Sequence, residues 1–287
     1  MTKKTSIAAI AGLAVLCAVH GLGGYARADD ALKPAAPKHI VSFNLCADQL
    51  LVALADPEQI AGLSPYATDP VLSVVAKEAA KFPRLDWNTE SVVNLAPDLI
   101  LSGLSDRPTR SILSATGLRV VEVGPISDLV AARQQARDVG ALVGHPERGE
   151  ALARALEQAE QKLAAAAFNP PRTASVVQRA GWTEGPQSLV SAMLTVAGLR
   201  PPPRAPAGFG GYVSMEQLLV AGPDILVLQD PPREATDQGA LFITHPALLA
   251  KYGPKRRIDM PSRYALCGGP ALVQGLDFLR EAITKLR

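Results

Sequence analysis

Residues Pro146–Phe168 read PERGEALARALEQAEQKLAAAAF and predict one unbroken helix of about six turns. Proline suits the first turn of a helix, where its missing N–H is not needed, and Asn169-Pro170-Pro171 prevents the helix from continuing. The apolar residues recur every three or four positions and predict one buried face, made of Leu152, Leu156, Ala159 and Leu163. We expect this helix to connect two parts of the chain.

A similar pattern occurs on each side of this helix. The two copies are Glu90–Leu101 (ESVVNLAPDLIL) and Glu216–Val227 (EQLLVAGPDILV). In each copy a glutamate begins a short apolar helix, Pro-Asp follows seven residues later, and a buried strand comes next. Helix–strand units recur by chance in α/β proteins, but the matched spacing favours two related lobes.

Short apolar runs alternate with helical patterns elsewhere, which predicts parallel sheets covered by helices. Before the connector we expect strands at 39–43, 60–63, 99–102 and 119–123, and helices at 45–54, 106–116 and 127–142. After it we expect strands at 173–178, 225–228 and 257–260, helices at 188–197, 245–249 and 269–286, and a loop at 198–211. The predicted division is a signal segment at 1–28, an N-terminal α/β lobe at 29–144, a connector at 145–169 and a C-terminal α/β lobe at 170–287.

The start of the chain predicts a cleaved secretory signal. Lys3 and Lys4 precede an apolar run from Ile7 to Val19, and Ala26-Arg27-Ala28 is a small-residue cleavage motif. This apolar run is too short to span a bilayer comfortably. We therefore expect an exported chain that begins near Asp29 and is not embedded in a membrane.

Charge and motifs exclude several classes of function. Cleavage removes three of the 29 basic residues and none of the 27 acidic ones, so the formal net charge changes from +2 to −1. Without a basic stripe, we expect no nucleic-acid partner. The sequence contains no phosphate-binding loop, no nucleophile elbow, no H-E-x-x-H and no cysteine pair at zinc spacing. We expect no catalytic residues, no metal site and no resident cofactor.

Cleavage would also remove one of the three cysteines and leave Cys46 and Cys267. In an oxidising compartment these two could form a disulfide, but their spacing cannot establish that they are close. The sequence leaves open a disulfide, which would restrict motion between the lobes, or two buried free thiols.

Four features together resemble one protein family. They are Ile40–Leu50 (IVSFNLCADQL), the Pro97-Asp98 strand start, the connector helix and Leu266–Pro270 (LCGGP). In these features, and along essentially all of the mature chain, the protein resembles the periplasmic substrate-binding proteins of iron-siderophore and vitamin B12 ABC importers. The resemblance implies a class III fold, with two Rossmann-like α/β lobes joined by a single long helix and a shallow cleft between them.

The same resemblance implies a function without catalysis. A monomer in the periplasm would capture a metal chelate and deliver it to an inner-membrane permease, whose ATPase drives uptake. In the family a glutamate on each lobe docks to arginines of the permease, and the matching positions here are Glu90 and Glu216. The alternative role for both is to complement a helix dipole, which contributes at most about 1 kcal/mol.

Ligand residues in such proteins lie in loops after the strands. The matching candidates here are Asn44, Tyr66, Arg84, Trp87, Arg179, Trp182, Tyr212, Arg263 and Tyr264. Aromatic rings suit a large planar chelate, and arginines suit carboxylate or catecholate oxygens.

An anionic ferric siderophore fits these arginines best. In the vitamin B12-binding members that this chain resembles, tryptophans line the ligand pocket. This chain has Arg84 and Gly103 near places where those members carry tryptophan. Cobalamin therefore remains an alternative, as does haem through Tyr66 or Tyr212. Two rivals of other classes also remain open, a secreted hydrolase and a receptor for a free divalent metal.

Overall fold

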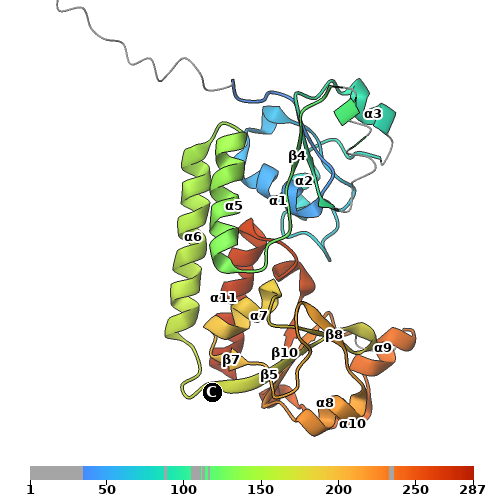
Figure 1. Ribbon diagram of the computed structural model, residues 1–287, viewed down its shortest axis with the longest axis vertical. Helices are drawn as coiled ribbons and strands as arrows, with labels where there is room; N and C mark the ends of the chain where they lie inside the picture. The colour runs from blue at the N-terminus through green and yellow to red at the C-terminus, as the bar shows by residue number, and fades with distance from the viewer. Residues whose placement is uncertain (1–34, 87–88, 105–110, 112–113, 116, 233–235) are drawn as a thin grey trace, which may run out of the picture. The chain divides into compact units, whose positions relative to one another are not determined.

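A computed structural model describes residues 35–86, 89–104, 111, 114–115, 117–232 and 236–287 (Figure 1). Residues Ala36–Arg287 form one compact unit. The expected signal segment, Trp87 and most of the helix predicted at 106–116 lie outside the described residues.

The first sheet has strand order β2-β1-β3-β4, and all of its strands are parallel. Its strands and the helices around it are β1 (Ile40–Ser42), α1 (Leu45–Leu54), β2 (Ile60–Gly62), α2 (Ala76–Ala79), α3 (Thr89–Asn94), β3 (Leu99–Ser102), β4 (Val120–Glu122) and α5 (Leu129–Leu142). Leu99 and Leu101 pack into one apolar cluster and Ile100 into another, so β3 is buried on both faces. This double burial explains why its sequence is continuously apolar.

The second sheet has the order β10-β9-β5-β6-β8, and the short strand β7 pairs with β5 outside this path. The elements after the connector are β5 (Arg172–Val177), β6 (Trp182–Glu184), α7 (Leu189–Val196), β7 (Leu199–Arg200), β8 (Gly210–Tyr212), α8 (Met215–Ala221), β9 (Ile225–Gln229), α9 (Gln238–Ile243), α10 (Pro246–Lys251), β10 (Arg257–Met260) and α11 (Gly269–Lys285). As in β3, alternate residues of β9 enter two different apolar clusters.

The expectation of parallel strands is confirmed for β5, β9 and β10 of the second sheet but is wrong for β6 and β8. Strands β6 and β8 are antiparallel to their neighbours, and β7 and the start of β8 occupy the segment predicted as the loop 198–211. Each of these strands has at most three residues. They are too short for an alternating pattern, and Gly210 and Gly211 have low strand propensity, so backbone pairing with β6 determines the structure.

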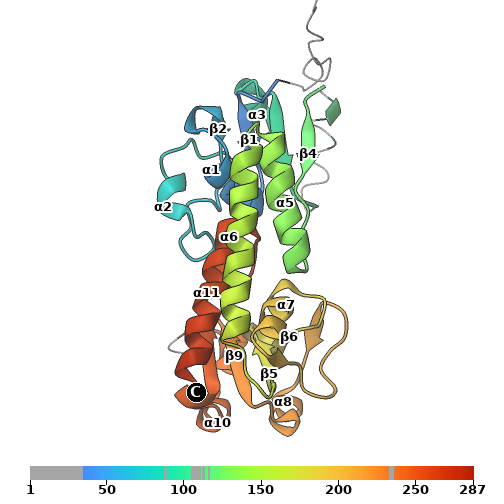
Figure 2. The same cartoon turned by 90° about the vertical axis from the view of Figure 1, so that its left-hand side faces the viewer.

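The connector is helix α6 (Pro146–Ala165), which lies beside α5 and α11 in both views (Figures 1 and 2). Its predicted face is confirmed, because Leu156, Ala159 and Leu163 are buried and Leu152 packs against the first core. The helix ends three residues before the predicted Phe168. The Phe168 N–H donates to the carbonyl of Ala197 at 3.0 Å, and its ring is buried in the second core, so tertiary packing ends the helix.

The repeated Pro-Asp pair has the same structural role in both sheets. The Asp98 carboxylate, just before β3, accepts the N–H groups of Lys38 and His39 at 2.7 and 3.0 Å, ahead of β1. Asp224, just before β9, accepts the N–H and hydroxyl of Thr173 in β5, both at 2.8 Å. Each aspartate therefore ties the start of its own strand to the neighbouring parallel strand, and the bonds from Thr173 lower the pKa of Asp224.

Candidate functional site

Two of the predicted ligand aromatics meet at the edge of the second sheet. Trp182 in β6 lies opposite Tyr212 in β8, and their rings pack edge to face with centroids 5.2 Å apart. Trp182 is half-buried, whereas 73% of Tyr212 is exposed. The pair offers an aromatic surface to solvent, which is the kind of surface that a planar ligand covers.

A polar network beside this pair includes residues that the sequence analysis missed. Gln178 directly follows β5 and Gln229 ends β9, so both lie at the carboxyl ends of parallel strands. The Nε2 of Gln178 donates to Oε1 of Glu184 and to Oε1 of Gln229, both at 2.6 Å. Polar residues at the end of a buried strand are a general signal of a ligand site in α/β sheets, and this signal could have identified them.

Glu184 is the carboxylate of this network. Burial raises its pKa, while hydrogen bonds from Ser188, Trp182 and Gln178 act in the opposite direction. The carboxylate is therefore a partly desolvated hydrogen-bond acceptor next to the aromatic pair.

Two of the predicted ligand arginines have partners within the chain. Arg179 forms an ion pair with Asp237, which lowers the pKa of Asp237. Arg263 donates from Nη1 to the carbonyl of Pro70 at 3.0 Å, and its guanidinium lies 5.1 Å from the ring of Tyr264. Tyr264 itself is half-buried against Phe278. The charges of these arginines are thus less available to an anionic ligand than the sequence indicated.

A cavity of about 620 Å³ also opens beside Tyr212. It lies between the proline-rich segment Pro202–Pro206 and α8, over Ser175 and Thr183 of the sheet. This volume falls within the range of small-molecule pockets. Tyr212 thus belongs both to the aromatic pair and to the cavity wall.

The candidates from the first sheet follow its strands. Asn44 caps α1, because its Oδ1 accepts the N–H groups of Cys46 and Ala47 at 3.0 and 3.2 Å. Tyr66 is 47% exposed in the loop after β2. Arg84 is exposed and its backbone pairs with Leu63. The capping role accounts for the position of Asn44 next to the strand end.

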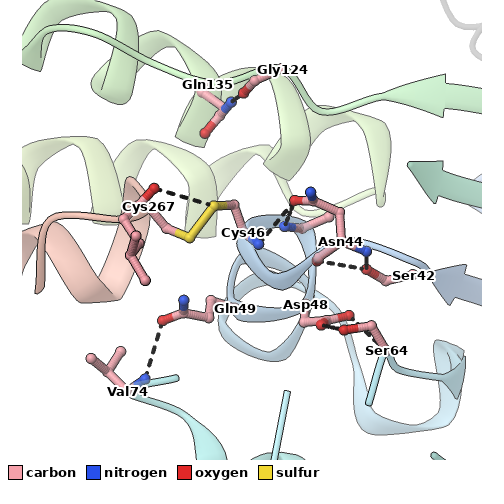
Figure 3. The surroundings of a disulfide bond; sticks show 12 residues. Ser42, Asn44, Cys46, Asp48, Gln49, Ser64, Val74, Gly124, Gln135 and Cys267 are labelled. Carbon is pink, nitrogen blue, oxygen red and sulfur yellow. Dashed lines mark hydrogen bonds between the residues drawn. A yellow bond between two sulfur atoms is a disulfide. The ribbon is translucent and has the colours of Figure 1, made fainter. Parts of the chain in front are cut away.

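The structure joins Cys46 and Cys267 in a disulfide (Figure 3). Cys46 lies in the first turn of α1, and Cys267 lies two residues before the start of α11. Gly269, the first residue of α11, has φ +64°, and a Cβ there would lie 2.8 Å from the Leu50 side chain. The CGGP segment therefore holds α11 tightly against α1.

Below the loop that carries Tyr66, a buried carboxyl group holds the loop in place (Figure 3). Asp48 of α1 accepts the N–H of Ser64 at 3.1 Å and its hydroxyl at 2.5 Å. Ser64 Oγ in turn accepts the N–H of Tyr66 at 3.3 Å. Burial raises the pKa of Asp48 to about 6, although hydrogen bonds from Ser42 and Ser64 oppose the shift.

This raised pKa predicts a pH-dependent stability. Because the folded state favours protonated Asp48, the stabilisation is complete below the ordinary pKa of 3.8 and is lost as the pH rises through about 6. The loss is about 3 kcal/mol at 1.36 kcal/mol per pKa unit. Asp48→Asn removes this dependence, so the stability of the variant relative to wild type is expected to rise by about 2 kcal/mol from pH 4 to pH 7, since part of the stabilisation is already lost at pH 4.

Urea unfolding of wild type and Asp48→Asn at intervals between pH 4 and pH 7.5 measures this difference, with Asp138→Asn as the exposed control. A difference between Asp48→Asn and wild type that stays constant over this range would contradict the titration of Asp48.

The two candidate docking glutamates occupy equivalent helix positions. Glu90 and Glu216 are each the second residue of a short helix, α3 and α8, and both are exposed. Ser214 and Gln217 form a capping box at the start of α8, with hydrogen bonds of 2.8 and 3.1 Å. A backbone N–H and Ser214 lower the pKa of Glu216, which favours its charged form.

Among the described residues, no helix is both long and apolar enough to cross a bilayer. In the same part of the chain, His, Cys, Asp and Glu form no group of three or more that could hold a metal ion.

Several solved structures are similar to this chain. The periplasmic heme-binding protein RhuT from Roseiflexus sp. RS-1 has a TM-score of 0.70 and 23% identity, over 87% of this chain and 98% of that one. The vitamin B12 binding protein BtuF of Vibrio cholerae has a TM-score of 0.68 and 17% identity, over 88% and 98%. A periplasmic heme binding protein from Pseudomonas aeruginosa has a TM-score of 0.68 and 23% identity, over 86% and 92%. At these identities the likeness establishes the fold.

No curated protein matches the chain at a significant level. The model of one protein family, described as periplasmic binding protein, matches residues 40–251. This match covers most of the chain, including the first sheet, the connector and most of the second sheet. The chain therefore belongs to the periplasmic binding protein family.

Proposed function

We propose that this protein is the substrate-binding component of an ABC importer, and that it captures a metal chelate in the periplasm and delivers it to the permease. Family membership supports the role of a receptor. The choice of ligand depends on the Trp182–Tyr212 pair beside the carboxyl ends of β5 and β9, in which Tyr212 is exposed and Trp182 half-buried. Such a surface suits a large, flat ligand.

Among the chelates that the sequence left open, we favour a tetrapyrrole-type macrocycle over an anionic ferric siderophore. The preference for a siderophore depended on arginines, and Arg179 and Arg263 have partners within the chain. The similar structures described above are those of heme-binding and vitamin B12-binding proteins. A macrocycle gains affinity mainly from aromatic contact, and so depends less on those two charges.

The proposal also covers where the protein is located and how its chain is divided into lobes. Residues 1–28 would direct export and then be removed, and the mature protein would be a monomer. Its lobes at 29–144 and 170–287 would enclose the ligand on either side of the connector at 145–169. Because α6 packs against both α5 and α11, and a disulfide joins the start of α1 to the segment before α11, closure on the ligand would be small.

A ligand titration tests this function. The chain has two tryptophans, Trp87 and Trp182, whose fluorescence should fall when a metal macrocycle binds. Wild-type protein is titrated with haem, cobalamin, ferric siderophores, and free zinc and manganese. Saturable one-to-one binding of a macrocycle is expected. Binding of a free metal alone would favour the metal receptor, and turnover in a hydrolase screen would favour the enzyme.

The aromatic pair makes a specific prediction. Trp182→Ala is expected to weaken binding of the macrocycle by about tenfold or more, because truncating a central aromatic side chain costs about 2 kcal/mol or more. Trp182→Phe should retain most of the affinity, since a ring remains. Calorimetry measures both constants without relying on Trp182 fluorescence. An unchanged dissociation constant for Trp182→Ala would exclude this residue from the site.

A further inference from the structure

Glu184 and Trp182 point to the same side of the second sheet. They are two residues apart in β6, and side chains two residues apart on a strand share a face. In the antiparallel register Trp182 lies opposite Tyr212, and Glu184 lies opposite Gly210. The carboxylate is therefore the next side chain along from the aromatic pair on which the ligand is proposed to lie.

The position opposite Glu184 must be glycine. Gly210 has φ +139°, and a Cβ there would lie 2.3 Å from the carbonyl oxygen of Thr183. Gly185 is equally confined, because a Cβ on it would lie 2.4 Å from the carbonyl oxygen of Gly208. This tight backbone approach means that β8 provides no side chain to cover Glu184, which is half-buried rather than buried.

The carboxylate is held by a network that defines its hydrogen-bonding role. Both donor bonds of Gln178 Nε2 are used, one to Glu184 and one to Gln229, which is 6% exposed. Gln178 is therefore fixed as a donor toward Glu184, and Glu184 faces it as an acceptor. An ionised carboxylate in this setting can accept further hydrogen bonds from a ligand, whereas a second carboxylate would be repelled.

Among the described residues, the positive charge nearest to Glu184 in sequence already has a partner. Arg179 precedes Glu184 by only five residues, but its guanidinium forms an ion pair with Asp237. Asp230 follows Gln229 at the end of β9 and adds a further carboxylate, which accepts the N–H of Ser262 at 3.0 Å. Among the described residues, Glu184 and Asp230 thus place two carboxylates at the carboxyl ends of the strands next to the aromatic pair.

We propose that Glu184 determines specificity by accepting hydrogen bonds from amide or hydroxyl donors on the rim of the chelate and by rejecting chelates that present a carboxylate there. This inference rests on the proposed function and narrows it to macrocycles with a donor-bearing rim. Gln178 and Gln229 act as positioning residues, because they orient the carboxylate.

Two corrinoids that share the same ring test whether Glu184 selects donor-bearing chelates over carboxylate-bearing ones. Cobinamide carries amides around its corrin ring, whereas cobyrinic acid carries carboxylates at the same positions. Their dissociation constants are measured by calorimetry for wild type, Glu184→Gln and Glu184→Ala. Glu157→Gln, at an exposed position on α6, is the control. Haem and a ferric siderophore are titrated in parallel, and thermal unfolding checks that each variant is folded.

Wild type is expected to prefer cobinamide, and Glu184→Gln should shift the ratio of the two dissociation constants at least about tenfold toward cobyrinic acid. Glu184→Ala should shift it in the same direction, and Glu157→Gln should leave it unchanged. A purely structural role would weaken both ligands equally and leave the ratio constant, which would overturn the inference. Binding of haem or siderophore without either corrinoid would also overturn it, but would leave the receptor function intact. Failure of every chelate to bind would remove both proposals.

Discussion

Replacing Cys46 and Cys267 together by serine is expected to lower the free energy of unfolding by about 3–5 kcal/mol. The disulfide joins residues 221 positions apart, and the stabilisation from limiting the unfolded chain grows with the length of the loop that is closed. For a loop of this length the chain-entropy model gives about 5 kcal/mol, and native-state adjustment reduces it. At about 2–4 °C per kcal/mol for a chain of this size, the melting temperature should fall by about 10 °C.

Urea and thermal unfolding of a chain that begins at Asp29 measure this loss, because such a chain contains only these two cysteines. Reduction of wild type should reproduce the double variant, and the same reductant should not affect the variant. Counting free thiols in unfolded, unreduced wild type should give none. Equal unfolding free energies for wild type and variant would contradict a stabilising bond between α1 and the segment before α11.

The local elements could be predicted because their signals are local. Helix 45–54 and strands 99–102 and 257–260 have the predicted bounds. Capping by Asn44, the continuous apolar run of 99–102 and the alternating pattern of 257–260 are all signals within a few residues. Helix α6 was predicted for the same reason, but the sequence placed its end three residues too late. The position of Phe168 depends on Ala197, which is distant in sequence.

The arrangement of the candidate site could be predicted only in part. Aromatic and arginine residues in loops after strands indicated a ligand surface, and the structure pairs Trp182 with Tyr212. Which charges remain available depends on partners far along the chain, such as Asp237 for Arg179. The spacing of two cysteines also contains no information about their distance in the fold. Glu184 was missed because it lies in a three-residue strand whose pairing depends on the glycines of β8.

Removing both proposed docking carboxylates, as Glu90→Ala with Glu216→Ala, is expected to reduce transport about tenfold or more while ligand binding stays within about twofold of wild type. Both glutamates lie in the first turn of a short helix, at corresponding positions of the repeated sequence unit. One exposed carboxylate beside each sheet could pair with arginines of a two-fold symmetric permease. Loss of both charge pairs should slow and weaken docking to the permease, so uptake should fall about tenfold or more.

Uptake of a labelled chelate by cells that carry the permease, or stimulation of the reconstituted ATPase, measures this effect. Glu78→Ala with Glu157→Ala is the matched control, since it removes two exposed carboxylates from other helices. Each single variant should lie between wild type and the double variant, because each leaves one contact. If the glutamates serve only the helix dipoles, the double variant should lose about 1 kcal/mol of stability or less and transport normally. Normal transport by a folded double variant would therefore assign both residues to their helices rather than to the permease.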